Sequence, residues 1–363
     1  MNPTEAPLLR TARIGPTDYW NDSCAVNELA YAIERGAVGA TSNPPIVVEV
    51  LAKERDYWVP RIRKLACANP GWSETDLTWA VFEEMAARGA GELLPVYERE
   101  KARKGWQSIQ TNPADYRDPL RMVAQGARFA SLAPNIQVKF PVTRAGLAAI
   151  EEAASQGINT TATVSFSVAQ AVAAAEAVER GLDRLARTGG DPAMLAPVSV
   201  IMMGRLDDWL KVVADRDEIL VDPGALNWAG IAVTKRAHAI FAERGYRSRV
   251  LAAAYRHHLH WTELVGGDLS MTIPHAWQVR FNNSGIVPVS RIAVPVAPSI
   301  LAELSRIPDF VRAYEPTGLS SEEFDSFGPT VRTLRGFIAA CHELASAIRD
   351  IVLPNPDRKE GPS

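Results

Sequence analysis

The sequence predicts an α/β protein, a (β/α)8 or TIM barrel with additional helices. Short apolar, β-prone segments alternate with stretches of helical spacing, which is typical of βα units around a parallel sheet. The expected strands cover residues 17–23, 37–42, 105–110, 135–140, 159–165, 197–203, 248–254 and 269–273. Eight such units close a barrel with its active site at the carboxyl ends of the strands. A chain of 363 residues, 47% of them apolar, is long enough for this fold.

Helices are expected between these strands, among them residues 26–35, 144–156 and 167–180. In the last of these, Ser167 precedes an alanine-rich body as an N-cap, and Gly181 follows as a typical stop. A long amphipathic helix is expected from Val331 to Val352, packed on the barrel. Its apolar residues recur at spacings of three and four: Leu334, Phe337, Ile338, Cys341, Leu344 and Ile348.

The chain is expected to form one barrel domain over residues 1–353. Two connections, residues 44–104 and 204–247, are longer than a minimal βα unit and carry helical patterns, so both are predicted to be helical insertions. Residues 354–363 are polar and proline-containing, and we expect them to be disordered.

Composition excludes several classes of partner. The 39 basic and 42 acidic residues give a net charge of -3 and are spread along the chain, so a nucleic-acid partner is not expected. No apolar run approaches the length of about 20 residues that spans a bilayer, and the amino terminus lacks the pattern of a secretory signal. Cys24, Cys67 and Cys341 have no metal-site or disulfide spacing, so they are expected to be reduced. These observations favour a cytoplasmic protein without a membrane partner. Cys24 is close in sequence to a candidate site residue.

Lys139 stands out because it lies in the short apolar segment NIQVKFPV, near the end of an expected strand. In a barrel both faces of a strand are covered, and burial lowers the pKa of a lysine toward the neutral form that attacks carbonyl carbons. Two ordinary explanations compete with this one. The lysine head could reach water at the strand end, or it could pair with a buried carboxylate.

Four segments together resemble the transaldolase family. They are DSCAVNELAYAIERGAVGATSNP from Asp22, NIQVKFPVTRAGLAAIEE around Lys139, GINTTATVSFSVAQAVAAAEA, and the weaker set MMGRLDDW, VLAAAYRHH and GGDLSMTIP. The resemblance implies a β/α barrel and class I aldolase chemistry without a cofactor. Lys139 would form a Schiff base with a ketose phosphate, and a dihydroxyacetone unit would pass to an aldose phosphate. It further implies a place in carbohydrate metabolism, in the pentose phosphate pathway.

The resemblance also assigns roles to individual residues. Asp22 matches the base that takes the donor hydroxyl proton, with Asp18 as the second candidate and a helix cap as the structural alternative for Asp22. Asn43 would contact substrate hydroxyls, although Asn before Pro also favours a turn. Thr163 matches the threonine that orients a catalytic water. Thr161 stands where many members have asparagine at a donor contact, and both threonines also suit a strand.

Arg205 and Arg256 match two arginines that hold the substrate phosphate, for which guanidinium geometry is suited. Each alone would be read as a surface ion-pair partner. His257, His258 and His260 follow the second arginine, but H-H-x-H has no established metal-ligand spacing, so no metal is expected. His257 and His258 could instead contact phosphate or lie on the surface.

Several positions depart from the family pattern. Gln110 stands where a typical transaldolase has glutamate, and fructose 6-phosphate aldolases also have glutamine there. An amide can orient water but cannot accept its proton. Val200 replaces the family serine, with Ser199 one residue out of register. Met202 replaces an aromatic residue that is tyrosine in the aldolases, and Ala254 replaces a small polar residue.

Three functions are therefore carried forward. The first is a transaldolase, and the second is an aldolase-type lyase that releases dihydroxyacetone without an acceptor. The third is a barrel that binds sugar phosphates without turnover. The partners expected are sugar phosphates, and the sequence leaves homo-oligomer formation open.

Overall fold

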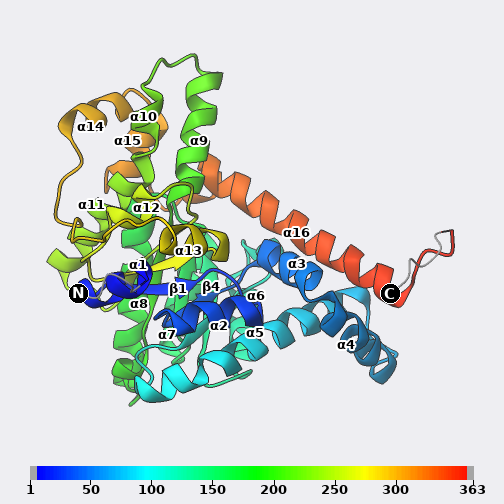
Figure 1. Ribbon diagram of the computed structural model, residues 1–363. Helices are drawn as coiled ribbons and strands as arrows, with labels where there is room; N and C mark the ends of the chain where they lie inside the picture. Colours follow the sequence, from blue (N-terminus) through cyan, green and yellow to red (C-terminus); the bar gives the residue numbers. More distant parts are fainter. Residues whose placement is uncertain (1–5, 358–363) are drawn as a thin grey trace.

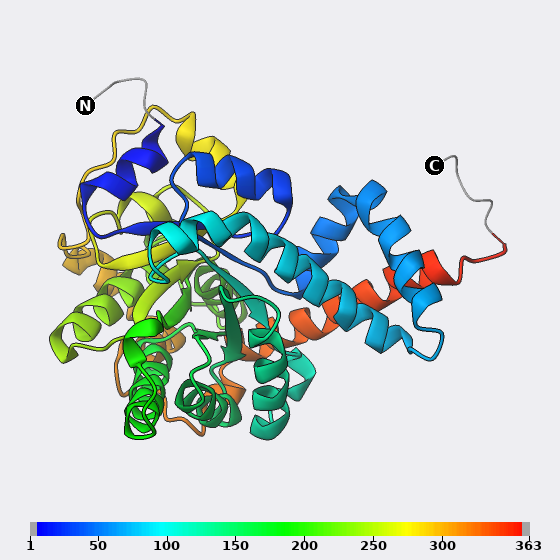
Figure 2. The same cartoon turned by 90° about the horizontal axis from the view of Figure 1, so that it is seen from below.

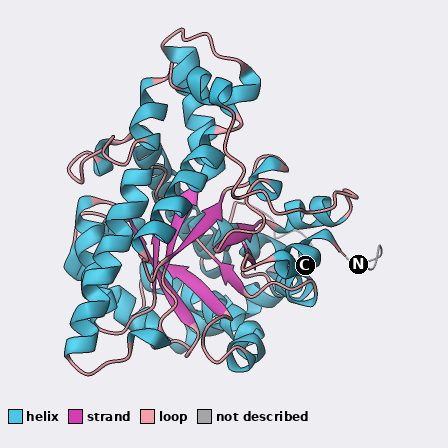
Figure 3. Ribbon diagram, turned by 90° about the vertical axis from the view of Figure 1, so that its left-hand side faces the viewer, coloured by secondary structure: helices cyan, strands magenta, loops and turns pink. Residues whose placement is uncertain are grey.

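The computed structural model describes residues 6–357, and its strands form one closed parallel barrel. Each strand pairs with its neighbours in sequence order, and β1 pairs with β8 to close the ring. Figure 3 shows the strands at the centre, surrounded by helices. Within residues 6–357 the eight strands overlap the eight predicted segments, which confirms the predicted fold class. Their bounds are Asp18–Asn21 (β1), Gly39–Thr41 (β2), Trp106–Gln110 (β3), Ile136–Pro141 (β4), Thr160–Thr163 (β5), Val198–Met202 (β6), Arg249–Ala253 (β7) and Leu269–Ile273 (β8).

The strand register turns several polar side chains toward the barrel interior. Gln110 on β3 is the Cα partner of Lys139 on β4, and Lys139 is in turn the partner of Thr161 on β5. Interior and exterior residues alternate along each strand, so Gln137 and Thr163 share the interior with them. Lys139 and Thr163 lie near the carboxyl ends of their strands, where barrel enzymes have their sites.

Two helices around the barrel follow the sequence prediction closely, α2 (Val26–Glu34) and α7 (Arg144–Ser155). A third, α8 (Val168–Arg187), begins where it is predicted but ends later. Ser167 caps α8, because its side chain accepts a hydrogen bond from the Gln170 amide. The predicted stop at Gly181 is wrong, since α8 continues through it. Gly181 instead permits close packing on α7, because a Cβ atom there would lie 2.5 Å from the Glu151 carbonyl oxygen.

Both long connections contain helices, as their sequence patterns predict. Residues 44–104 contain α3 (Pro44–Lys53), α4 (Arg55–Ala68) and α5 (Glu74–Arg99). Residues 204–247 lie mainly in α9 (Met203–Arg216), α10 (Pro223–Leu226) and α11 (Ala229–Arg244). The start of α5 is fixed by a capping box, in which the side chains of Ser73 and Asp76 each accept a hydrogen bond from the other's backbone amide.

The C-terminal helix α16 runs from Gly328 to Val352 and begins slightly before the predicted start. Its first part lies against the barrel, and its second part projects beside α4 and α5 (Figures 1 and 2). Arg349 near its end forms an ion pair of 2.6 Å with Glu74 at the start of α5. The expectation that the helix packs on the barrel is thus correct for only part of its length. The predicted disorder of residues 354–363 falls largely outside the described residues.

Shorter helices that the sequence pattern does not specify complete the chain. They are α1 (Pro7–Ile14), α6 (Pro119–Ala130), α12 (Leu259–Thr262), α13 (His275–Asn282), α14 (Pro298–Leu304), α15 (Pro308–Tyr314) and the 3-10 turns η1 (Pro113–Asp115), η2 (Pro192–Met194) and η3 (Phe324–Ser326). Most are too short for a clear helical period, which explains why periodicity does not reveal them. Among the helices of residues 6–357, none combines the length and the apolar character that a membrane span requires.

Candidate functional site

A cavity of about 230 Å³ lies at the carboxyl ends of the strands, on the face where β/α barrels carry out their chemistry. Six residues of the predicted site line it: Asp22, Asn43, Lys139, Thr163, Arg205 and Arg256. Gln110 and Thr161 are not among the lining residues, although both face the barrel interior. The fold therefore gathers side chains that are far apart in the sequence around one space.

Lys139 lies near the end of β4 with 5% of its surface exposed. Its Nζ atom donates a hydrogen bond to the carbonyl oxygen of Ser42, 3.1 Å away. Burial lowers the pKa of Lys139 to about 8; the Asp22 carboxylate opposes this shift and the Arg205 guanidinium adds to it. Such an amine is partly unprotonated at neutral pH and can attack a carbonyl carbon. The burial does not fit a lysine whose head reaches bulk water.

Asp22 follows β1 and lies close enough to Lys139 for their charges to interact. The Thr41 hydroxyl donates a hydrogen bond of 2.6 Å to Oδ1 of Asp22 and is also 2.6 Å from the Thr272 hydroxyl. Burial raises the pKa of Asp22, although Lys139, Thr41 and Arg205 oppose the shift. A carboxyl group with a raised pKa can exchange a proton with a substrate hydroxyl closer to neutral pH.

The two competing explanations for this aspartate do not fit the structure. Asp18 begins β1 at the opposite end of the barrel, where its carboxylate accepts hydrogen bonds of 2.7 Å from both Lys104 and Arg249. It is an ion-pair residue away from the cavity, so the second candidate for the base is wrong. A helix cap by Asp22 is also wrong, because α2 begins only at Val26.

Asn43 caps a helix and also lines the cavity. Its Oδ1 accepts a hydrogen bond of 3.1 Å from the Ile46 amide and caps α3. The same residue lines the cavity. The cap fixes the side chain at the rim, so turn formation and contact with a substrate are compatible here.

Gln110 and the two threonines of β5 occupy different depths. Gln110 ends β3 with 1% of its surface exposed, and its Oε1 has no hydrogen-bond partner within residues 6–357. Such a buried acceptor is suited to a water molecule or a substrate hydroxyl. Thr163 lines the cavity, whereas the Thr161 hydroxyl lies 3.2 Å from that of Ser108, deeper in the barrel. The structure therefore gives Thr161 a side-chain partner below the cavity.

Arg205 lies in the first turn of α9, at the cavity. Its guanidinium stacks over the Phe337 ring of α16 at 5.0 Å, and its Nη1 is 3.5 Å from the Thr333 hydroxyl. Burial and the neighbouring Arg256 lower its pKa, although it stays protonated at any physiological pH. The C-terminal helix thus helps to hold a cation at the site, which the sequence pattern did not indicate.

Arg256 lies three residues after β7 and is exposed at the cavity rim. Its Nη2 and Nε donate hydrogen bonds of 2.8 and 3.0 Å to Oδ2 of Asp208 on α9. Its Nη1 donates another to the Tyr255 carbonyl oxygen. Two guanidinium groups at one cavity are suited to binding a phosphate dianion.

Three positions at which the sequence departs from the family pattern lie at the cavity. Val200, Met202 and Ala254 line the cavity, whereas the Ser199 hydroxyl lies 3.1 Å from that of Ser248. The serine next to the family position is therefore engaged elsewhere. At these three positions the cavity wall is more apolar than the family pattern implies.

Sequence reasoning missed four polar residues of the cavity: Thr41, Glu49, Tyr255 and Thr272. Thr41 belongs to the T-S-N-P turn and Thr272 to the last of the quoted segments, so the motifs themselves were a signal. The Tyr255 hydroxyl is buried and has no hydrogen-bond partner within the described chain. Burial raises the pKa of Tyr255, and the charge of Asp22 adds to the shift. Met202 stands where the aldolases have tyrosine, but the phenol of Tyr255 lies at the same cavity.

The histidine segment gathers the one group of residues in the described chain that could hold a metal ion: Asp207, His257 and His260. The Arg256 amide donates a hydrogen bond of 3.2 Å to Nδ1 of His260. A neutral imidazole that accepts at Nδ1 carries its proton on Nε2, the atom that faces Asp207. This proton occupies the position that a metal would need. His258 is exposed, and neither it nor His257 lines the cavity.

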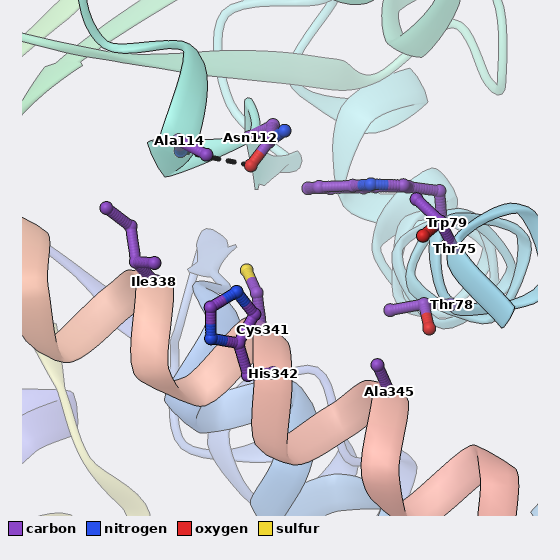
Figure 4. A pocket seen from close by; sticks show the side chains of 9 residues that line it. All are labelled: Thr75, Thr78, Trp79, Asn112, Ala114, Ile338, Cys341, His342 and Ala345. Atoms are coloured by element: carbon purple, nitrogen blue, oxygen red, sulfur yellow. Dashed lines mark hydrogen bonds between the residues drawn. The ribbon is translucent and has the colours of Figure 1, made fainter.

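A second cavity, of about 170 Å³, lies between α5, η1 and α16 (Figure 4). Trp79 lines it on one side, and Cys341 and His342 line it on the other. Burial raises the pKa of the Cys341 thiol to about 12, so it stays protonated at neutral pH. Burial likewise raises the pKa of Cys24 to about 12. All three cysteines are free. The groups suited to chemistry are thus in the barrel cavity.

A barrel whose catalytic face holds a buried lysine, a carboxyl group and two arginines has the arrangement expected of a class I aldolase that acts on sugar phosphates. Comparison with known proteins agrees. The family model described as Transaldolase/Fructose-6-phosphate aldolase matches residues 19–308. The chain belongs to this family.

Two of the relatives that we compare are similar over most of the chain, and a third over about half of it. The transaldolase of Thiobacillus denitrificans is 28% identical over 298 residues, which cover 76% of this chain and 82% of that protein. The transaldolase of a Parafrankia species is 28% identical over 332 residues, 83% of this chain and 88% of that protein. A transaldolase of Thermobifida fusca is 32% identical over 183 residues, 48% and 47% of the two chains. The chain is a transaldolase-like enzyme.

Proposed function

We propose that this enzyme transfers a dihydroxyacetone unit from a ketose phosphate to an aldose phosphate through an imine on Lys139. The observation that carries the proposal is the buried amine, whose pKa burial lowers to about 8, at a cavity shared with Asp22. Desolvation supplies the neutral nucleophile, and the carboxyl group supplies a proton acceptor nearby.

In the proposed reaction the Lys139 amine adds to the ketose carbonyl carbon, and the carbinolamine loses water to give an iminium. Asp22 accepts the proton of the hydroxyl on the carbon beyond the scissile bond. That C–C bond breaks, its electron pair moves into the iminium as an enamine, and an aldose phosphate leaves. The enamine then attacks the aldehyde carbon of the acceptor, Asp22 returns the proton, and water releases the product.

The remaining residues bind and orient. Arg205 and Arg256 would hold the phosphate, because guanidinium groups match its oxygens. Asn43 at the rim would contact hydroxyls of the substrate. Gln110 and Thr163 would position the water that leaves and returns at the iminium carbon. Thr161 supports this layer from below, and a direct substrate contact there has weaker support because its hydroxyl lies near Ser108.

A second candidate function, an aldolase-type lyase, is favoured by one observation. Gln110 can orient water but cannot accept a proton, unlike a glutamate. Without that proton relay, the balance between transfer and release of dihydroxyacetone can differ. Binding of sugar phosphates without turnover is the third candidate, and the retention of Lys139 and Asp22 weighs against it.

The test of the Schiff base is borohydride reduction in the presence of fructose 6-phosphate, followed by mass spectrometry of the peptides. We expect a reduced adduct on Lys139 and its absence in Lys139→Met. If no ketose phosphate gives an adduct on the unmodified chain, the proposed chemistry is wrong, and binding without turnover becomes the better explanation.

The test of transfer against release is the rate of free dihydroxyacetone formation with and without erythrose 4-phosphate. For a transferase, sugar phosphate products appear only with the acceptor and little dihydroxyacetone is released. Release that is equally fast without acceptor supports the lyase instead.

We further propose that the enzyme acts in the cytoplasm, in the pentose phosphate pathway. Free thiols fit a reducing compartment, and the family fits sugar phosphate metabolism. Cell fractionation and metabolite levels after gene deletion test both points. Whether the chain forms a homo-oligomer is tested by light scattering.

A further inference from the structure

A buried carboxylate and imidazole lie directly behind Arg256. Asp207 on α9 and His260 on α12 are both fully buried, and Oδ2 of Asp207 lies 2.8 Å from Nε2 of His260. The other oxygen of Asp207 accepts a hydrogen bond of 2.8 Å from the Gly230 amide at the start of α11. Nδ1 of His260 accepts the Arg256 amide at 3.2 Å. The pair thus joins two helices to the backbone of the rim arginine.

The direction of each hydrogen bond in this chain of groups follows from one donor. A backbone amide can only donate, so Nδ1 of His260 must be an acceptor and the ring proton must lie on Nε2. That proton is donated to the Asp207 carboxylate. Burial lowers the pKa of His260, although Asp207 opposes the shift, so the neutral ring that this arrangement needs is favoured. Every group in the series is then satisfied.

The segment that these bonds hold has an unusual backbone. Ala254 follows β7 with a φ of 66°, a left-handed conformation that costs energy for a residue with a side chain. Its carbonyl oxygen accepts the Gly204 amide at 2.9 Å, and a Cβ atom on Gly204 would lie 2.1 Å from that oxygen. The start of α9 therefore contacts Ala254, two residues before Arg256. His260, which is bonded to Asp207, holds the amide of Arg256 itself.

Helix α9 consequently controls both arginines of the cavity. It carries Arg205 in its first turn, and Asp208 binds the guanidinium of Arg256. Asp207, the neighbouring residue, holds the Arg256 backbone through His260. A buried polar pair is costly unless it is fully satisfied, and an apolar pair could fill the same space. Here the polar pair supplies an acceptor, Nδ1 of His260, for the backbone amide of Arg256 at the cavity rim.

We propose that Asp207 and His260 are positioning residues that orient Arg256 for the phosphate group of the substrate. They do not touch the substrate themselves. The inference rests on the proposed function to the extent that Arg256 is taken as a phosphate ligand. It adds two residues that the assigned site does not contain, and it explains why one histidine of the H-H-x-H segment is buried while His258 is exposed.

The test measures the affinity of the full chain for inorganic phosphate by calorimetry, which needs no turnover. His260→Leu removes the acceptor of the Arg256 amide. We expect the dissociation constant for phosphate to rise about 10- to 100-fold, because a misplaced Arg256 guanidinium would lose about one hydrogen bond to the charged phosphate. Asp207→Asn keeps the side-chain volume but replaces one of the two acceptor oxygens with an NH2 group, so either the His260 or the Gly230 hydrogen bond is lost. It provides a second variant if the first fails to fold. His258→Leu, two residues away on the surface, is the matched control and should bind phosphate as the unmodified chain does.

A positioning role has a signature that general destabilisation lacks. In an Arg256→Ala background, His260→Leu should weaken phosphate binding no further, because the residue that it orients is gone. In steady-state assays the KM for phosphorylated substrates should rise while kcat/KM for the unphosphorylated sugars stays unchanged.

Other results overturn the inference. The inference is wrong if Arg256→Ala weakens phosphate binding while His260→Leu and Asp207→Asn both leave it unchanged. Failure of the unmodified chain to bind phosphate, or stoichiometric Zn²⁺ binding that His260→Leu abolishes without affecting phosphate, would also overturn it. If phosphate affinity falls as expected but no ketose phosphate labels Lys139, the positioning role stands and the proposed chemistry fails.

Discussion

Replacing Asp22 with asparagine separates its electrostatic effect on Lys139 from its proposed role as the base. The Asp22 carboxylate raises the pKa of Lys139, in opposition to burial. Asp22 is also the proposed acceptor of the substrate proton, because it lines the same cavity as Lys139. Asp22→Asn removes both the charge and the base while keeping the volume and an oxygen for the Thr41 hydroxyl. We therefore expect imine formation and C–C cleavage to respond in opposite ways.

The magnitudes follow from the Lys139 pKa of about 8 against an ordinary value of 10.5. At pH 7 about a tenth of the amine is neutral, compared with about one part in 3,000 for an ordinary lysine. Without the Asp22 charge the Lys139 pKa falls further, so the neutral fraction rises and adduct formation speeds up at low pH. Loss of the base should lower the rate of C–C cleavage about 100- to 10,000-fold.

Two assays on one variant test this reasoning. Borohydride trapping with fructose 6-phosphate from pH 5.5 to 9 reports imine formation, and product release under the same conditions reports cleavage. Asp18→Asn is the matched control, because Asp18 begins the strand that Asp22 follows and pairs with Lys104 and Arg249 at the far end of the barrel. It should leave the pH profile of trapping unchanged. If Asp22→Asn moves that profile to higher pH, or leaves cleavage intact, the assigned roles are wrong.

Further predictions concern single groups. The rate of adduct formation in the unmodified chain should rise about tenfold per pH unit up to about pH 8 and then level off, because only the neutral amine reacts; a midpoint near 10 would contradict the burial effect. Gln110→Glu should move this midpoint upward, since a carboxylate beside Lys139 favours the charged amine; trapping measured against pH checks it, with Gln110→Met as the uncharged control. Gly204→Ala should lower the free energy of unfolding by about 1–3 kcal/mol and weaken phosphate binding, because its Cβ would lie 2.1 Å from the Ala254 oxygen; unchanged urea unfolding would refute the argument.

Much of the fold could be predicted from the sequence because the barrel repeats one pattern. Each strand corresponds to a short apolar segment of the sequence, and in each long helix apolar residues recur every three to four positions. Where the prediction failed, tertiary contacts decided the outcome. Gly181 reads as a helix stop, but its missing side chain serves packing between α7 and α8. The projecting end of α16 has the same period as the packed part, so the period alone could not reveal its partners.

The site was predictable where a motif encodes chemistry and unpredictable where geometry alone brings groups together. Lys139 and Asp22 belong to recognisable segments and line one cavity. The contact of Arg205 with Phe337 joins residues from separate segments, and nothing local in either segment indicates it. The Asp207 and His260 pair likewise depends on the helices that carry them. Burial, which sets the pKa of Lys139, is a property of the whole barrel.

If Arg205 binds the substrate phosphate as proposed, it connects substrate binding with the reactivity of Lys139. Its charge lowers the Lys139 pKa, and the Asp22 charge raises it, so the free cavity balances one cation against one anion near the amine. A phosphate dianion bound at Arg205 offsets that cation, and the electrostatic balance then favours a protonated lysine. Burial is the largest contribution to the shift and does not depend on either charge. On the proposed function, the amine would therefore stay reactive in the substrate complex because burial lowers its pKa, and Arg205 would bind phosphate without disabling the nucleophile.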